Sequence, residues 1–289
     1  MKKKMLKFLF RFTSELFKTI VSSLSILIFS KFYPFRKLNK VLPIKSERKC
    51  FVIGNGPSFK EILDHDYKIF LNSEVFVVNL FCLNEYFEKI KPNNYVVADI
   101  GFWIDTNDER ILEIQKSFKI RMNSITWEVN LFVPSDASIE FYNSLVINKK
   151  LNVIKYNRTP VEGLKLFSHI FYKYNLGMPR PENVIVAAIF LAINSGNLKI
   201  DLYGIDFSSV ETFFIDDDNN ICVRPKHFYS KKDEVLKYRH LKNDEFKISL
   251  SSMASALDSY EKLNEYAINK NVTIINKTNP SYVEAFTKE

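Results

Sequence analysis

The chain has 289 residues, 46% hydrophobic and 26% charged, which are ordinary proportions for a globular protein with a substantial core. Its net charge of +8 is unevenly distributed: residues 1–49 hold 13 Lys or Arg against two acidic residues, a net of +11, so the remainder sums to −3. This distribution argues against nucleic-acid binding by the body of the protein. Cys50, Cys82 and Cys222 are scattered and form no C-x-x-C pair, so they indicate neither a disulfide framework nor a zinc site.

Residues 1–49 form a basic segment of their own. Apolar residues alternate with Lys7, Arg11 and Lys18, and the run from Thr19 to Phe29 carries no charge. That run is about half of the roughly 20 apolar residues that a spanning helix needs. The pattern predicts an amphipathic helix lying on an anionic membrane surface, followed by a basic linker over 34–49.

Two alternatives for this segment stay open. A signal peptide has a similar basic start and apolar middle, but no small-residue cleavage site follows Phe29. An amphipathic helix packed on the body or on a partner would show the same pattern. The sequence does not decide whether residues 1–30 span a membrane, lie on it or pack on the body.

The segment from Phe51 to Ser58, FVIGNGPS, predicts a buried strand that runs directly into a glycine turn. Ser58 stands where a helix N-cap would, and Glu61 three residues later completes a capping box. A strand, a glycine turn and a helix N-terminus together predict an anion site made of free backbone N–H groups. The turn lacks the third glycine of G-x-G-x-x-G and the Gly-Lys-Ser/Thr end of a P-loop, so it indicates a nucleotide or sugar nucleotide without specifying NAD or ATP.

Strands and helices alternate through the rest of the chain. Apolar runs predict strands at 75–79, 95–100, 119–133, 151–156, 199–206 and 272–275. Helical patterns occur at 84–89, 109–118, 181–194 and 251–269. Residues 207–250 are polar, aromatic and irregular, as expected of a lid.

This alternation predicts an α/β fold with a Rossmann-like, mostly parallel sheet over 50–289. Ligands of such sheets bind at the carboxyl ends of the strands. The polar residues expected at that edge are Asn55, Asn79, Asp99, Asp206, Asn276 and Asn279.

Several segments together resemble the bacterial sialyltransferase family that decorates lipooligosaccharides, and the wider MptE-like group. They are IGNGPSFKEI, VFVVNLFCLNEYFEK, VVADIGFW, RPENVIVAAIFLAINSGNLKIDLYGIDF and KHFY, in the family's order over about 51–289. The resemblance implies an inverting, metal-independent transfer of a nonulosonic acid from its CMP donor, with a GT-A-like variant of the fold. It implies no cofactor.

The resemblance also implies which residues bind the donor. Two positions depart from the family: Asp99 replaces an asparagine, and Arg180-Pro-Glu-Asn-Val184 replaces Arg-x-Thr-Ser-Gly, where Asn183 stands in for the hydroxyl pair. His227 matches the catalytic histidine. The expected donor-binding residues are Gly54, Asn55, Gly56, Pro57, Ser58, Asn79, Asp99, Arg180, Asn183, Tyr203, Gly204, Asp206, Tyr229, Asn279 and Ser281.

The chemistry of the lid suits this transfer. An imidazole at His227 can act as the base on the acceptor, and Tyr229, Lys231 and Lys232 can stabilise the leaving phosphate. A surface-loop histidine is the competing interpretation of His227. His65, His169 and His240 lack comparable neighbours and are expected to be structural or solvated.

No metal site is predicted. The oxygen-rich run Asp216–Asn220 lacks the glycine and the distal glutamate of an EF-hand, so a hairpin turn is expected there. Asp206 is expected either to bind the ribose or to cap the next turn. Phe213 and Phe214 are expected to pack in the lid.

The sequence therefore predicts a glycosyltransferase that moves a nonulosonic acid, of sialic acid or Kdo type, from a CMP-sugar to a glycan or glycolipid acceptor. It would lie peripherally on the cytoplasmic face of the bacterial inner membrane and act in capsule, lipopolysaccharide or O-antigen assembly. The alternatives are an MptE-like, magnesium-dependent pyrophosphokinase and a non-catalytic nucleotide-binding scaffold. A homo-oligomer is compatible with the sequence.

Overall fold

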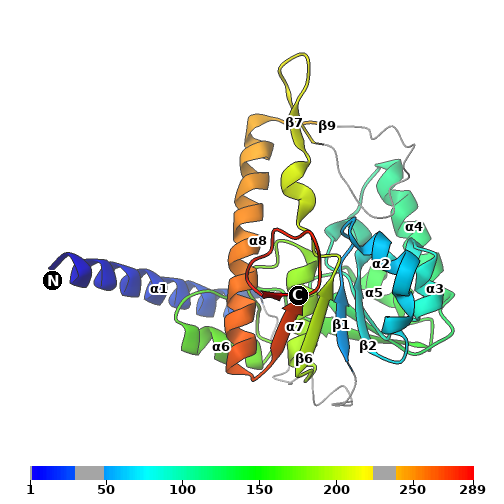
Figure 1. The fold of residues 1–289 in the computed structure, drawn as a ribbon, viewed down its shortest axis with the longest axis horizontal. Helices are drawn as coiled ribbons and strands as arrows, with labels where there is room; N and C mark the ends of the chain where they lie inside the picture. Colours follow the sequence, from blue (N-terminus) through cyan, green and yellow to red (C-terminus); the bar gives the residue numbers. More distant parts are fainter. Residues whose placement is uncertain (1, 30–48, 224–238) are drawn as a thin grey trace.

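A central sheet of eight strands organises the protein (Figure 1). The structure, a computed structural model, describes residues 2–29, 49–223 and 239–289. The strand order is β11-β10-β6-β1-β2-β3-β4-β5, and all seven pairings are parallel, which confirms the predicted Rossmann-like α/β fold. The strands are β1 (Cys50–Ile53), β2 (Glu74–Val78), β3 (Asn94–Val96), β4 (Val129–Pro134), β5 (Leu151–Tyr156), β6 (Lys199–Tyr203), β10 (Thr273–Asn276) and β11 (Thr287–Lys288).

Helices cover both faces of the sheet, so its central strands are buried on both sides and consist almost entirely of apolar residues. Phe51 and Ile53 of β1 face one core, and Cys50 and Val52 face the other. Four helices pack on the first face: α2 (Phe59–Asp66), α3 (Tyr86–Ile90), α4 (Glu109–Asn123) and α5 (Ile139–Leu145). Three pack on the second: α6 (Lys165–Lys173), α7 (Val184–Asn194) and α8 (Asn243–Asn269).

The order of the strands defines one special place in the sheet. From β1 the chain moves outward through β2, β3, β4 and β5, and then returns to place β6 on the other side of β1. Between β1 and β6 the direction of winding therefore reverses. Such a switch point leaves a crevice outside the carboxyl ends of the two strands.

The predicted lid contains a small antiparallel sheet of β7 (Phe213–Ile215), β8 (Ile221–Val223) and β9 (Arg239–His240), preceded by the short helix η5 (Ser208–Glu211). The expected hairpin turn at 216–220 is confirmed, because the N–H of Asp216 donates to the Asn220 carbonyl at 3.1 Å. Phe213 packs in the lid as expected, with its ring 5.2 Å from that of Phe246 in α8.

The N-terminal helix α1 (Lys2–Phe29) projects away from the body along most of its length (Figure 1). Thr19, Ser22 and Ile26 are buried against the body, while large apolar side chains on the other faces are exposed. Within the described chain, α1 is the one helix whose length and hydropathy would suit a membrane span, over Met5–Phe29 with a mean hydropathy of 1.4. A signal sequence or a core helix can satisfy the same criteria.

Several predicted boundaries are wrong. The helix expected at 109–118 continues to Asn123, because Phe118 and Met122 both enter the core, so β4 starts only at Val129. The helix expected from 251 begins at Asn243, inside the predicted lid. The short helices α5 and α6 were not expected.

Two predicted helix starts also need correction. The helix expected from 181 begins at Val184, and the side chain of Asn183 caps it. The capping box at Ser58 does not form. Its backbone is helical, with φ −60° and ψ −24°, whereas a side-chain cap needs extended geometry at that residue.

Candidate functional site

A cavity of about 410 Å³ lies at the switch point between β1 and β6. We call it the switch-point cavity. The turn after β1, the end of β6, the start of α7, the lid and α8 line it. Its lining includes Asn55, Gly56, Asn183, Gly204, Phe213 and Tyr260. Its volume is in the usual range for a site that encloses a small molecule.

Close backbone packing shapes one wall of this cavity. The N–H of Gly54 donates to the Tyr203 carbonyl at 2.8 Å, and the N–H of Gly56 donates to the Gly204 carbonyl at 2.9 Å. A Cβ atom at Gly56 would lie 1.6 Å from Oδ2 of Asp206 and 2.6 Å from the Gly204 carbonyl oxygen. The glycine turn is therefore required for β1 and β6 to meet at this point.

These hydrogen bonds overturn part of the expected anion site. Besides Gly54 and Gly56, the N–H of Ser58 is also used, since it donates to Oδ1 of Asp206 at 3.1 Å. The N–H of Phe59 donates to the Gly56 carbonyl at 3.1 Å. Because these donors are already satisfied inside the protein, the turn is no P-loop-like cradle, and a phosphate would need other partners.

The turn and the loop after β6 that contacts it carry three buried polar atoms that have no hydrogen-bond partner among the described residues. They are Oδ1 of Asn55, Oγ of Ser58 and Oδ2 of Asp206. The amide nitrogen of Asn55 donates to the Val78 carbonyl at 3.3 Å. This bond fixes the orientation of the amide group, whose oxygen accepts no hydrogen bond from the described residues. Unsatisfied buried polar atoms are costly. Of these three residues, Asn55 lines the switch-point cavity, whereas Ser58 and Asp206 do not.

Asp206 is nearly inaccessible to solvent, with 4% of its surface exposed. Burial raises the pKa of Asp206, although hydrogen bonding from Ser58 acts in the opposite direction. Its Oδ1 accepts from the Ser58 N–H and so holds the glycine turn after β1, whereas the sequence predicts that Asp206 caps the turn that follows it or binds the ribose. Asp206 does not line the switch-point cavity.

Asn79 and Asp99 follow β2 and β3, but neither side chain lines the switch-point cavity. Oδ1 of Asn79 accepts a hydrogen bond from the N–H of Ala98 at 3.2 Å. Asp99 is exposed, and its carboxylate accepts from the N–H of Gly101 at 2.8 Å. Asp99 thus stabilises a local turn, and Asn79 joins the end of β2 to the segment that follows β3.

Arg180 and Asn183 lie in one loop before α7 but face different cavities. Asn183 lines the switch-point cavity, where its Oδ1 accepts from the N–H groups of Ile185 and Val186 at 3.0 and 3.2 Å. Its amide nitrogen donates to the Tyr260 hydroxyl at 3.1 Å. Arg180 lines a second cavity, described below.

Seven more expected donor-binding residues lie near the switch point without lining the cavity: Gly54, Pro57, Ser58, Tyr203, Asp206, Asn279 and Ser281. Tyr203 packs its ring 5.4 Å from that of Phe70, and burial raises the pKa of Tyr203. Ser281 is structural, since its hydroxyl donates to the Ile205 carbonyl at 2.7 Å. Pro57 and Asn279 are exposed.

The expected catalytic residue, His227, lies outside the described residues, as do Tyr229, Lys231 and Lys232. Of the other histidines, His169 packs beside Tyr172 and Tyr266, and burial lowers the pKa of His169.

The lid holds a group of metal-ligand atoms that was not predicted from the sequence. The carboxylate of Asp216, the thiol of Cys222 and the imidazole of His240 lie within 4.8 Å of one another. The hairpin register pairs Cys222 with His240, which a single sequence does not disclose. The Asp216 carboxylate also accepts from the N–H of Asn220 at 2.8 Å, which stabilises the hairpin turn.

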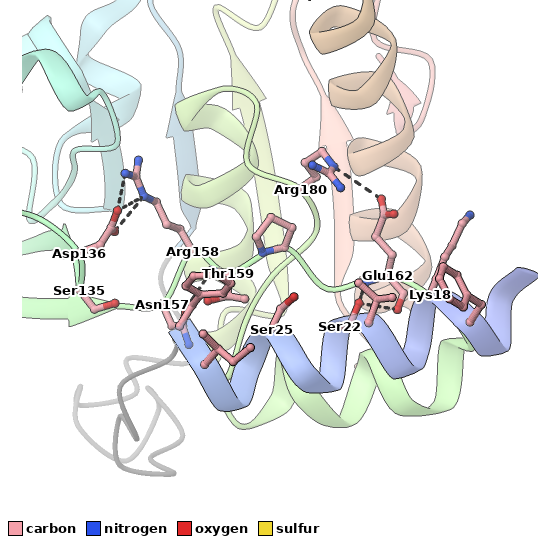
Figure 2. A pocket seen from close by; sticks show the side chains of 15 residues that line it. Lys18, Ser22, Ser25, Ser135, Asp136, Asn157, Arg158, Thr159, Glu162 and Arg180 are labelled. Atoms are coloured by element: carbon pink, nitrogen blue, oxygen red, sulfur yellow. Dashed lines mark hydrogen bonds and ion pairs between the residues drawn. The ribbon is translucent and has the colours of Figure 1, made fainter.

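A second cavity, of about 630 Å³, lies between α1 and the body (Figure 2). We call it the α1 cavity. Ser135 and Asp136 after β4, Arg158 and Thr159 after β5, and Arg180 before α7 line its body side. No local pattern in the sequence predicts it, because its two sides lie more than 100 residues apart in the chain.

No protein-family model matches the sequence, and no curated protein matches it either. Among solved structures, the fold is similar to the MAf glycosyltransferase from Magnetospirillum magneticum AMB-1, with a TM-score of 0.44 and 10% identity. The alignment covers 86% of this chain and 34% of that chain. A likeness of this size assigns neither a family nor an activity to the protein.

Proposed function

We propose that the protein is a glycosyltransferase that binds a CMP-activated nonulosonic acid in the switch-point cavity and transfers the sugar to a cell-surface glycan. The observation that carries the proposal is the cavity itself, with the unpaired oxygen of Asn55 in its lining. Parallel α/β sheets bind nucleotides at such a switch point. A cytosine amino group or a ribose hydroxyl could donate to this oxygen.

The reaction type is supported by the resemblance of the sequence to the lipooligosaccharide sialyltransferases. On that basis the transfer inverts the anomeric centre and needs no metal, and His227 takes the proton from the acceptor hydroxyl. Tyr229 is proposed to stabilise the leaving phosphate from the same segment. The occupied N–H groups of the glycine turn favour such a phosphate partner outside the turn.

A place at the membrane surface is part of the proposal. The exposed apolar residues of α1 together with Lys7 and Arg11 suit a helix that lies on an anionic leaflet. We propose the cytoplasmic face of a bacterial inner membrane, where a glycan or glycolipid acceptor in polysaccharide assembly would be accessible.

Calorimetric titration of the full chain with CMP, CDP, UDP, GDP and ATP, each with and without Mg²⁺, tests the proposal. A preference for CMP that does not depend on Mg²⁺ is the expected result. A preference for ATP with Mg²⁺ would replace the transferase with a pyrophosphokinase. Binding of none of them would leave a scaffold as the better description.

A matched pair of variants on α8 tests whether the nucleotide occupies the switch-point cavity. Ser249 lines the cavity, whereas Ser251 lies on the same helix, is exposed and does not line it. Ser249→Trp should weaken CMP binding by about tenfold or more, which corresponds to about 1.4 kcal/mol. Ser251→Trp adds the same side chain and should leave binding nearly unchanged. Equal effects of the two variants would move the nucleotide site elsewhere.

A further inference from the structure

The α1 cavity has an apolar side and a polar side. Its helix side carries Phe17, Val21, Ile28 and Phe29, all exposed apolar side chains of α1. Its body side carries polar and charged groups, which Figure 2 shows approaching from the loops opposite the helix. A ligand that fills it must therefore be apolar along one side and polar along the other.

The helix side is held in place by specific contacts. The hydroxyl of Ser22 donates to the Glu162 carbonyl at 3.0 Å and accepts from the Glu162 N–H at 2.9 Å. The N–H of Leu164 donates to the Thr19 hydroxyl at 2.8 Å. Thr19 and Ser22 are both buried, so the body of the protein positions this part of α1 and the cavity has two fixed sides.

The charged groups of the cavity differ in how well they are compensated. Arg158 donates to Asp136 from Nε at 2.9 Å and from Nη2 at 2.6 Å, and Nη1 donates to the Ala98 carbonyl at 2.9 Å. The positive charge of Arg158 is therefore compensated by the carboxylate of Asp136. Arg158 also lies over the Trp103 ring, 5.5 Å from its centroid, which fixes the guanidinium further.

Arg180 is less compensated than Arg158. Among the described residues its guanidinium makes one ion pair, 3.9 Å from Glu162, and no hydrogen bond. Glu162 is itself paired more closely with Lys262, at 2.9 Å. Burial raises the pKa of Glu162, but Lys262, Arg180 and Lys18 together lower the pKa below its ordinary value, which favours the ionised carboxylate. Lys262 is the closer of its two paired cations. Arg180 is thus the cation in the cavity best placed to bind an added anion.

We infer that the α1 cavity binds a lipid that carries a phosphate, with its chain along Phe17, Val21 and Ile28 and its phosphate on Arg180. Apolar burial along the chain and a charge-assisted hydrogen bond at the head supply complementary parts of the affinity. Exposed apolar side chains of α1 extend from this wall toward the N-terminus, so a lipid could enter the cavity from a membrane on which the helix lies.

The position of this site suggests a role for the lipid in the proposed transfer, and this role rests on the proposed function. Arg180 lines the α1 cavity and Asn183, three residues later, lines the switch-point cavity. One short loop thus forms part of the boundary of both. A lipid phosphate on Arg180 would place a glycan attached to it beside the proposed donor, as a lipid-linked acceptor requires.

Calorimetry of the full chain in dodecyl maltoside micelles, with farnesyl phosphate as the probe, tests the inference. Farnesol lacks the anion and inorganic phosphate lacks the chain, and each should bind at least about tenfold more weakly. Dioctanoyl phosphatidate distinguishes two sources of the lipid phosphate. A preference for farnesyl phosphate indicates an isoprenoid carrier, and equal binding indicates a membrane phospholipid. Inorganic phosphate binding as tightly as farnesyl phosphate would overturn the inference.

Two matched pairs of variants locate the site. Val21 lines the cavity, whereas Leu24 is exposed on the same helix outside it, so Val21→Glu should weaken farnesyl phosphate binding by about tenfold and Leu24→Glu should not. Arg180→Gln should weaken it similarly, while Arg110→Gln removes an exposed charge elsewhere and serves as its control. Equal losses from Val21→Glu and Leu24→Glu would mean simple partition into the micelle and would overturn the inference.

Titrations of the unmodified chain with CMP and with farnesyl phosphate separate the two proposals. CMP binding without farnesyl phosphate binding by the unmodified chain would overturn the lipid site and leave the transferase standing. Farnesyl phosphate binding without nucleotide binding would preserve the lipid site and remove its role as an acceptor site.

Discussion

Asp206 combines burial, one hydrogen bond and one unpaired oxygen at the glycine turn. Burial disfavours its ionised form, which raises the pKa of Asp206 above that of an exposed aspartate. Between the unfolded value of 3.8 and the raised folded value, the native state binds more protons than the unfolded state. The contribution of this group to stability therefore falls as the pH rises through that window.

Asp206→Asn removes this titration while keeping an oxygen that can accept from the Ser58 N–H. We expect the difference in unfolding free energy between the variant and the wild type to shift in favour of the variant as pH rises above 3.8, and to level off above the folded pKa. Urea denaturation at a series of pH values measures it. Asp99→Asn, at an exposed carboxylate, reports the effect of removing one negative charge. A difference independent of pH would contradict the prediction.

Single residues at the switch point were only partly predictable from the sequence. The two glycines of the turn could be found, because a tight turn after a buried strand needs them. The partners of their N–H groups could not, since Tyr203 and Gly204 come from a strand about 150 residues later in the chain. The sequence predicts that the N–H groups of the turn are free. In the structure they donate to carbonyl groups at the end of β6.

At the scale of elements, Gly163 determines how α1 meets the body. A Cβ atom there would lie 2.2 Å from Oγ1 of Thr19, 2.5 Å from its backbone nitrogen and 2.8 Å from the Glu15 carbonyl oxygen. The φ of +114° at Gly163 is also unfavourable for a residue with a side chain. The backbone of α1 can approach this closely only because position 163 is glycine.

Gly163→Ala should therefore release α1 from the body without unfolding the sheet. Hydrogen–deuterium exchange measures this directly: amides of residues 15–26 should exchange at least about tenfold faster, while those of β1 remain protected. Gly101→Ala is the control, because the nearest contact of a Cβ there would be the exposed carboxylate of Asp99, at 3.2 Å, with no backbone atom closer. Unchanged exchange in α1 would show that the helix tolerates the added methyl group.

Elements with strong apolar patterns were predicted well and the others poorly. Ten of the eleven residues of α7 are buried, and its apolar run was recognised, although its first residue was misplaced by the Pro-Glu pair before Asn183. The helices α5 and α6 have seven and nine residues and follow irregular segments, so their periodicity is too short to separate them from loops. Tertiary packing in the two cores determines these short elements.

At the scale of the whole molecule, positive charge and exposed apolar area are concentrated at one end. The exposed apolar side chains of α1 include Leu6, Phe10 and Phe17, and Lys7 and Arg11 lie between them. The helices of the body already cover both faces of the sheet, so the exposed part of α1 is not needed to bury them. A helix packed wholly on the body would bury these side chains, and the proposed adsorption to a membrane would cover them.

We expect the full chain to sediment with vesicles containing phosphatidylglycerol more than with pure phosphatidylcholine vesicles, and less so at high salt. Phe10→Asp should lower the vesicle affinity by about tenfold, because it replaces a side chain that is 78% exposed on α1. Ile147→Asp changes a residue that is 69% exposed on the body and should have little effect. Equal behaviour of the two variants would indicate that α1 does not contact the lipid.

The helix α8 connects the two cavities. Ser249 and Met253 near its start line the switch-point cavity. One turn or two later, Ser259 donates to the Arg180 carbonyl at 2.9 Å and Tyr260 bonds with Asn183, so the loop between the cavities is attached to the helix. Lys262 then pairs with Glu162 of the α1 cavity. One helix of 27 residues thus contacts the switch-point cavity, the dividing loop and the α1 cavity in sequence. If both proposed ligands bind, a displacement of α8 by one of them would reach the other site, and binding at the two sites would be cooperative.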